Sequence, residues 1–225
     1  MSTPSFPAAW GPLPSGRHRL SRDEVLTSQR GRIVAAMAAV VTEKGFGPVA
    51  VGDVVRRANV SKRTFYEHFP DKESCFLAMY DIGIEFIVGR TAEAVESLPG
   101  DDWAARLRVG LTAYLEVLAA EPDFAWALVI ETLAAGPEAT ARRAAAVELF
   151  ASSYRQLYAL ARHDDRSLPT LPDEHFLALT GGIDELVRET LRTRGAASLP
   201  EVLEVAMRFL EVTFYADPGP RRRRS

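Results

Sequence analysis

The chain of 225 residues, 47% of them hydrophobic and 25% charged, is long enough for a small domain and a larger one and too apolar to be wholly disordered. No apolar stretch approaches the roughly 20 residues of a membrane-spanning helix, no signal region opens the chain, and the single cysteine excludes a disulfide framework, so we expect a cytoplasmic protein without a membrane partner. The net charge of -3 is unevenly distributed along the chain. Residues 1–75 hold 11 Lys and Arg against 7 Asp and Glu, whereas residues 76–225 hold 16 against 23. Only the first part therefore favours binding to a polyanion.

Residues 1–20 hold four prolines and show no hydrophobic period, so we expect them to form a disordered arm. Order is expected to begin at Ser21, which has capping-box spacing to Glu24. Apolar residues then recur at helical spacing through Lys44, and the glycines and proline of 45–48 end this first predicted helix.

Two short helices joined by a tight turn are predicted next. The first spans 51–58, where valines share one face, and it stops at Asn59, a residue type that tolerates the left-handed conformation. Ser61 can cap the second helix, 62–69, and Asp71 can cap a longer helix after it. Two short helices with such a turn are typical of a helix-turn-helix.

Beyond residue 98 the sequence predicts helices only. Prolines and glycines separate the candidate segments, which are 102–120, 122–135, 137–163, 172–193 and 199–215. No alternating run bounded by hairpin turns occurs, so no sheet is expected. The sequence therefore predicts an all-α protein.

The second short helix combines an apolar side with a polar one. Val60, Phe65 and Phe69 are spaced to pack against the helices before it, and the other side carries donor-bearing side chains. Such a helix suits the major groove of DNA, where base edges present acceptors. By position we assign base contacts to Lys62, Arg63 and Thr64, phosphate contacts to Ser61, Tyr66 and Lys72, and either role to His68. The solvated face of an ordinary helix is the alternative.

This stretch resembles the TetR family of bacterial regulators. The resemblance rests on Val60-Ser61, Thr64-Phe65-Tyr66, Phe69 and Lys72-Glu73. It implies an all-α dimer with its ligand pocket and dimer interface in the C-terminal part, and it matches Thr64, Tyr66 and Lys72 to positions that usually touch the operator. The chain departs from the family at Asn59, where glycine is usual, and at Val51, where threonine is common, so the helix over 51–58 lacks an obvious side-chain cap.

The C-terminal segments offer candidate residues for an effector and for a dimer interface. Residues that could line a cavity are Trp103, Tyr114, Phe124, Trp126, Glu131, Phe150 and Tyr154. For each of them an ordinary core position is the alternative. The last two predicted helices are amphipathic, and the equivalent pair dimerises in the family resembled. Their apolar residues include Phe176, Leu179, Ile183, Leu186, Val187, Val202, Val205, Met207, Phe209 and Leu210.

Patterns for catalysis or metal binding are absent from the sequence. None of the four histidines follows a glutamate at three-residue spacing, and no His-Glu-x-x-His, Cys-x-x-Cys or P-loop sequence occurs. We therefore expect neither an enzyme nor a bound metal ion or cofactor. Cys75 occupies an apolar position and is expected in the core.

These observations predict a disordered arm (1–20), a three-helix helix-turn-helix DNA-binding domain (21–75), a helical ligand-binding and dimerisation domain (76–216) and a disordered basic tail (217–225). We expect a homodimeric transcriptional regulator, a repressor that a small-molecule effector releases from palindromic double-stranded operator DNA. A helical protein-binding scaffold with no DNA target is the alternative, and a small-molecule enzyme in the C-terminal bundle is a third hypothesis.

Overall fold

The computed structural model of the protein describes residues 22–100 and 102–215. The predicted arm, Ser21 of the predicted capping box and the basic tail lie outside the described residues. Within the described ranges every regular element is a helix and no strand occurs, which confirms the predicted all-α fold. None of the helices described there is long and apolar enough to cross a membrane.

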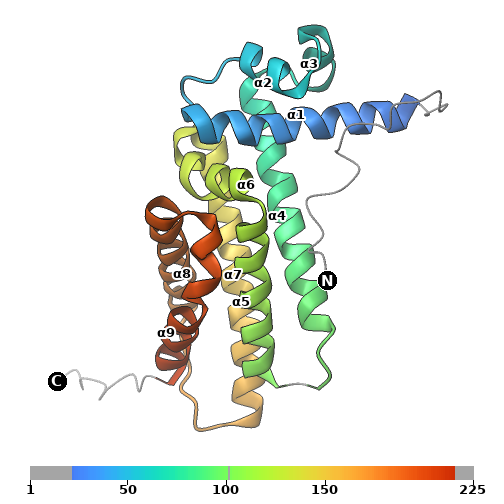
Figure 1. Ribbon diagram of the computed structural model, residues 1–225. Helices are drawn as coiled ribbons and strands as arrows, with labels where there is room; N and C mark the ends of the chain where they lie inside the picture. The colour runs from blue at the N-terminus through green and yellow to red at the C-terminus, as the bar shows by residue number, and fades with distance from the viewer. Residues whose placement is uncertain (1–21, 101, 216–225) are drawn as a thin grey trace.

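Three helices form the N-terminal end of the molecule (Figure 1). They are α1 (Arg22–Lys44), α2 (Val51–Ala58) and α3 (Lys62–His68). The first of them lies across the end of the long helices, and α2 and α3 pack on its outer side. Although Gly31 lowers helix propensity, α1 is continuous through this buried residue, because packing of its apolar face against the core outweighs the local cost.

Capping interactions define the ends of the short helices as the sequence predicts. Asn59 follows α2 with a φ of 52°, in the left-handed region. The Ser61 hydroxyl accepts a hydrogen bond from the Thr64 N–H at 3.0 Å, which caps α3. The Asp71 carboxylate accepts one from the Ser74 N–H at 2.7 Å, which caps the next helix. These caps satisfy backbone donors that a helix start leaves free.

A bundle of long helices forms the rest of the structure. It is entered by α4 (Lys72–Glu96), which runs through the predicted domain boundary after residue 75 without a break. The remaining elements are α5 (Trp103–Ala120), α6 (Pro122–Trp126), η2 (Ala127–Glu131), η3 (Thr132–Ala134), α7 (Pro137–Asp164), α8 (Asp173–Arg194), η4 (Ala196–Val202) and α9 (Leu203–Tyr215). Figure 1 shows α6 directly beneath α1, where the Thr42 hydroxyl donates to the Asp123 carbonyl at 3.1 Å.

The segment predicted as one helix over 122–135 changes its hydrogen bonding twice. After α6 the backbone continues as the π-helix η2 and then as the 3-10 helix η3. The buried Thr132 hydroxyl lies 3.1 Å from the Ala127 carbonyl oxygen and 2.8 Å from that of Leu128. The Thr132 hydroxyl therefore donates to backbone carbonyl groups at the point where the backbone hydrogen bonding changes from π-helical to 3-10. π-helical turns are rare and are frequent at functional sites.

Two glycines allow unusually close packing in the bundle. A Cβ atom on Gly83 of α4 would lie 2.8 Å from Cδ1 of Leu128 in η2. A Cβ atom on Gly182 of α8 would lie 2.8 Å from Cε1 of Phe209 in α9. Any side chain at these positions would force its neighbour to move. The core also contains Cys75, which is fully buried as predicted, and burial raises the pKa of its thiol.

Candidate nucleic-acid interface and ligand cavity

One side of α3 is anchored in the protein core and the other faces solvent. Phe65 is 0% exposed and Phe69 is 3% exposed, with their ring centroids 5.8 Å apart. On the outer side Ser61, Lys62, Arg63 and Tyr66 are exposed; we call these four residues the reading face. Tyr66 is 55% exposed. Buried aromatic rings thus hold a short helix whose donors point outward.

The side chains of the reading face are weakly engaged within the subunit. Among the described residues the Lys62 ammonium has no hydrogen-bond or ion-pair partner. The Arg63 guanidinium pairs with Glu67 at 3.0 Å, but its side chain is 89% exposed, and such pairs contribute little. Thr64 is half-buried, and its hydroxyl lies 2.9 Å from that of Ser61. Lys62 and Arg63 are therefore available to an anionic or acceptor-rich partner.

His68 is turned away from the reading face. It is half-buried, and its Nε2 atom is buried without a hydrogen-bond partner among the described residues. Burial, followed by the nearby positive charge of Arg30, lowers the pKa of His68. The last turn of α3 directs this side chain toward Phe69 and Arg30 of α1, so the contact of His68 with DNA stays a prediction.

Lys72 also takes a different place from the one predicted. Its Nζ atom donates to the carbonyl oxygens of Phe46 at 3.2 Å, Gly47 at 3.0 Å and Val49 at 3.0 Å. It also lies 4.6 Å from the centroid of the Phe46 ring. An ammonium has three donors, and here all three hold the loop between α1 and α2. In this structure Lys72 supports that loop, and its direct contact with a phosphate stays a prediction.

The start of α2 is held by a charged cluster. The Asp53 carboxylate accepts hydrogen bonds from Lys44 at 2.8 Å, from Arg56 at 2.5 Å and from the Ala50 N–H at 3.2 Å. The bond from Lys44, followed by that from the Ala50 backbone, lowers the pKa of Asp53 to about 2. This carboxylate supplies the local cap that the sequence around Val51 lacks.

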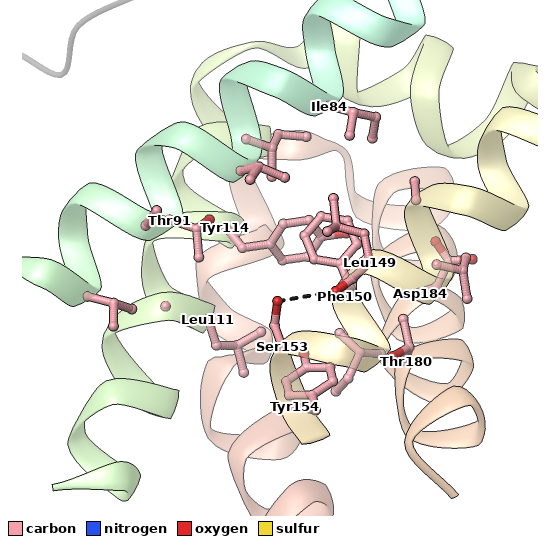
Figure 2. A pocket seen from close by; sticks show the side chains of 18 of the residues that line it. Ile84, Thr91, Leu111, Tyr114, Leu149, Phe150, Ser153, Tyr154, Thr180 and Asp184 are labelled. Atoms are coloured by element: carbon pink, nitrogen blue, oxygen red, sulfur yellow. Dashed lines mark hydrogen bonds between the residues drawn. The ribbon is translucent and has the colours of Figure 1, made fainter. Parts of the chain in front are cut away.

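A cavity of about 450 Å³ lies in the bundle between α4, α5, α7 and α8, and Figure 2 shows it from close by. This volume is within the usual range of small-molecule sites, about 300–1,000 Å³. Its walls are mostly apolar side chains. Of the residues predicted to line a cavity, Tyr114, Phe150 and Tyr154 do so. The rings of Tyr114 and Phe150 lie 5.7 Å apart.

The other four residues predicted to line a cavity, Trp103, Phe124, Trp126 and Glu131, do not line this one. Trp103 packs 6.1 Å from Phe214 at the far end of the bundle. Phe124 is buried in the short helix beneath α1. Helical spacing shows that such residues are buried but leaves open which neighbouring helix they face.

Glu131 instead joins the C-terminal bundle to the N-terminal helices. Its Oε2 atom accepts a hydrogen bond from the Phe46 N–H at 2.9 Å, and its Oε1 atom accepts one from Trp126 Nε1 at 3.4 Å. Leu128 and Val129, from the same π-helical turn, line the cavity. Leu128 and Val129 of the turn η2 thus border the cavity, whereas Glu131 of the same turn binds the loop between α1 and α2. Sequence reasoning missed this connection, since Phe46 and Glu131 lie 85 residues apart.

An apolar stripe on α8 and α9 faces solvent. Leu177 is 45%, Val205 61%, Phe209 42% and Val212 63% exposed; we call these four residues the α8–α9 face. Only Val205 and Phe209 of this face were among the predicted interface residues. Most of the others are buried in the core of this subunit, namely Phe176, Leu179, Ile183, Val187, Val202, Met207 and Leu210, while Leu186 is partly buried.

The described residues contain no group of three or more His, Cys, Asp or Glu side chains that could hold a metal ion. The structure thus combines three features: an exposed, donor-bearing helix at one end, an apolar cavity in the bundle, and a π-helical turn between them.

Comparison with known proteins agrees with this arrangement. Residues 33–79 match the family described as bacterial regulatory proteins, tetR family. The chain is similar to the HTH-type transcriptional regulator EthR of Mycolicibacterium smegmatis, with 32% identity over 106 residues, which are 47% of this chain and 48% of that protein. The HTH-type transcriptional activator FasR of the same organism is 28% identical over 101 residues, 45% of this chain and 43% of that protein. These matches span about half the length of the curated relatives.

Solved structures resemble the whole fold at low sequence identity. The fatty acid degradation regulator FadR from Bacillus halodurans has a TM-score of 0.73 and 17% identity, covering 87% of this chain and 97% of that one. The regulator FadR from Bacillus subtilis, in complex with stearoyl-CoA, has a TM-score of 0.70 and 16% identity, covering 81% of this chain and 96% of that one. Residues 33–79 are therefore similar to the helix-turn-helix region of bacterial regulatory proteins of the tetR family, and the fold of the chain resembles solved structures over most of its length.

Proposed function

We propose that the protein is a DNA-binding transcriptional regulator, a homodimeric repressor that a small molecule releases from its operator. The observation that carries this proposal is the reading face of α3, whose donors are exposed while Phe65 and Phe69 fix the helix in the core. In a helix-turn-helix the second helix enters the major groove with its N-terminal residues at base edges. Lys62, Arg63 and Thr64 would then contact bases, and Ser61 and Tyr66 would contact phosphates.

The α8–α9 face supports the proposed homodimer. Val205, Phe209 and Val212 follow one another at spacings of four and three residues, so they form a stripe along α9. Exposed apolar surface of this kind marks interaction sites. Beside it Gly181 has open space around a Cβ position, which permits a partner helix to approach closely. A two-fold dimer would place two copies of α3 on half-sites about 34 Å apart.

The turn η2 supports release of DNA by a ligand. A molecule in the cavity would contact Leu128 and Val129, and the same turn carries Glu131, which binds the loop before α2. Movement of this turn would change the position of α2 and α3 relative to the bundle, and hence the separation of the two reading faces in a dimer. A ligand that favours one of these arrangements shifts DNA affinity by its differential binding free energy.

Footprinting and gel-shift assays with intergenic DNA next to the protein's own gene test the proposal. We expect protection of a pseudo-palindrome, and loss of about tenfold or more in affinity for Lys62→Ala. The matched control is Lys44→Ala, a lysine bound to Asp53 at the other end of α2. Equal affinity of the Lys62 variant and the parent for all DNA tested, or no protected palindrome, would contradict the proposal. A reporter gene behind the operator then tests repression.

A further inference from the structure

The cavity in the bundle is long and narrow. Its lining runs along α4 from Tyr80 to Glu96 and along α5 from Arg106 to Leu118. At about 1.5 Å per residue, these stretches are about 24 Å and about 18 Å long. The cavity volume of about 450 Å³, spread over such a length, leaves a mean cross-section of about 19–25 Å². That area suits one extended hydrocarbon chain, whereas a fused ring system is wider.

The cavity is closed at the end beside η2. The Arg142 guanidinium of α7 donates to the Asp81 carboxylate of α4 at 3.0 Å, which places the first lining residues of both helices at this end. Ala146 lies one turn further along α7 and is buried. Leu128 of η2 packs against Gly83 so tightly that a Cβ atom there would lie 2.8 Å from Leu128 Cδ1. Buried side chains thus surround this part of the cavity, which we call the closed end.

The cavity opens to solvent between α4 and α7, and we call this opening the α4–α7 edge. The exposed residues that line it are Ala92, Glu96, Leu149, Ser153, Gln156 and Leu160. Figure 2 shows Thr91 of α4 and Ser153 of α7 bordering the same space. The seam between α4 and α5 is closed instead, since a Cβ atom on Gly110 would lie 3.3 Å from Val95 Cγ2. A polar group at the α4–α7 edge keeps part of its hydration, whereas one at the closed end would lose it.

The charges along the lining balance one another. Among the described residues that line the cavity, two arginines stand against two carboxylates, namely Arg106, Arg143, Glu96 and Asp184. The Arg143 guanidinium donates to the Asp184 carboxylate, and Arg106 donates to a backbone carbonyl oxygen at 2.8 Å. Glu96 is exposed to solvent at the α4–α7 edge. A charge carried into the cavity would lose its hydration without gaining a free partner of opposite sign, so the buried part of a ligand is expected to be uncharged.

We infer that the cavity binds a linear aliphatic chain, with its uncharged tail at the closed end and its polar group at the α4–α7 edge. The inference rests on the proposed function only in taking this cavity as the effector site. It names the shape and chemical class of the effector and its orientation. The tail would contact Leu128, which belongs to the same turn as Glu131 and thus to the connection with the loop before α2.

Titration calorimetry on the full chain without DNA tests the inference with ten-carbon probes. 1-Decanol and 1-adamantanol have the same number of carbons and the same hydroxyl group, but the first is an extended chain and the second a compact cage. We expect 1-decanol to bind about tenfold or more tightly, because the cage is too wide for the cavity. Decanedioate carries a charge to the closed end in either direction and should bind about tenfold or more weakly than 1-decanol. Equal or tighter binding of 1-adamantanol or decanedioate, or no binding of 1-decanol, would overturn the inference.

The variant Ala146→Leu tests the orientation of the chain. Ser153 of the α4–α7 edge lies two turns along α7 from Ala146, a distance of about 10 Å. A chain whose polar group stays at that edge reaches Ala146 in 1-decanol but falls short of it in 1-hexanol. The larger side chain should therefore weaken 1-decanol about fivefold or more and leave 1-hexanol unchanged, and retained binding of 1-hexanol shows that the variant folds. The matched control Ala92→Leu makes the same change at the α4–α7 edge and should affect both alcohols equally.

Equal loss of affinity for both alcohols in Ala146→Leu, or no loss for 1-decanol, would overturn the inference. Operator binding by the parent protein without ligand is measured separately. Failure to bind any operator would count against the proposed function, whereas operator binding beside failed 1-decanol binding would count against this inference alone.

Discussion

Replacement of Lys72 by methionine separates two roles for this side chain. Methionine keeps most of the apolar stem but removes the ammonium that binds the carbonyls of Phe46, Gly47 and Val49 at 3.0–3.2 Å. Hydrogen bonds from a charged donor contribute about 1.5–3 kcal/mol each when buried. Because Lys72 is only half-buried, we expect about 2–3 kcal/mol for the three together. For a chain of this size that loss lowers Tm by roughly 5–10 °C.

The assay combines thermal or urea unfolding with operator binding at several salt concentrations. If Lys72 contacted a phosphate in each subunit, its removal would make the slope of log K against log salt shallower by about 1.8, since each contact contributes about 0.9. The structure predicts lower stability with an unchanged slope. Lys62→Met provides the converse control, because Lys62 is exposed and unpaired among the described residues; it should weaken operator binding and leave Tm unchanged. Undiminished stability with a shallower slope for the Lys72 variant would refute this reasoning.

Four further changes test other parts of the structure. Ser61→Ala removes the cap of α3 and should cost about 1 kcal/mol, measured by urea unfolding, with Ser61→Asp as the variant that restores the acceptor. Gly83→Ala places a Cβ atom 2.8 Å from Leu128 and should lower the free energy of unfolding by about 1–3 kcal/mol. Unchanged stability would show that Leu128 and the turn η2 move aside without cost. His68 has a folded-state pKa below its ordinary value of 6.5, so the unfolded chain takes up its proton first and stability should fall as pH drops below about 6.5; His68→Gln should remove this part of the pH dependence. Val205→Glu places a charge on the α8–α9 face and should give monomers in light scattering, whereas a persistent dimer would exclude this face as the interface.

Local chemistry made the N-terminal helices predictable from the sequence. Ser61 and Asp71 cap helices through partners three residues away, and Asn59 adopts its left-handed conformation by its own backbone preference. Such interactions depend on neighbours along the chain. The apolar spacing of Phe65 and Phe69 likewise indicated which side of α3 would be buried.

Contacts between distant segments were not predictable in this way. Lys72 and Phe46 are 26 residues apart and Glu131 and Phe46 are 85 apart, so neither pair leaves a local pattern. The sequence predicts a phosphate contact for Lys72 from its position at the start of a helix, and a place in a cavity wall for Glu131 from the aromatic residues around it. Trp103 and Tyr114 have similar helical settings in the sequence, yet only Tyr114 borders the cavity. The two residues are about three turns apart on nearly the same side of α5, so their position along the helix separates them: Trp103 packs against Phe214 of α9, and packing over the whole bundle decides where along α5 the cavity lies.

The π-helical turn η2 provides a way to convert a small displacement into a discrete one. A π turn contains more residues than an α turn, so its relaxation to α-helical bonding would rotate everything on one side of it by about 100° and shift it by about 1.5 Å, the geometry of a single residue. Glu131 lies at the end of this turn. A change of register would therefore carry the Glu131 carboxylate away from the Phe46 N–H in one step. The hydrogen bond would then be either made or broken, without intermediate positions.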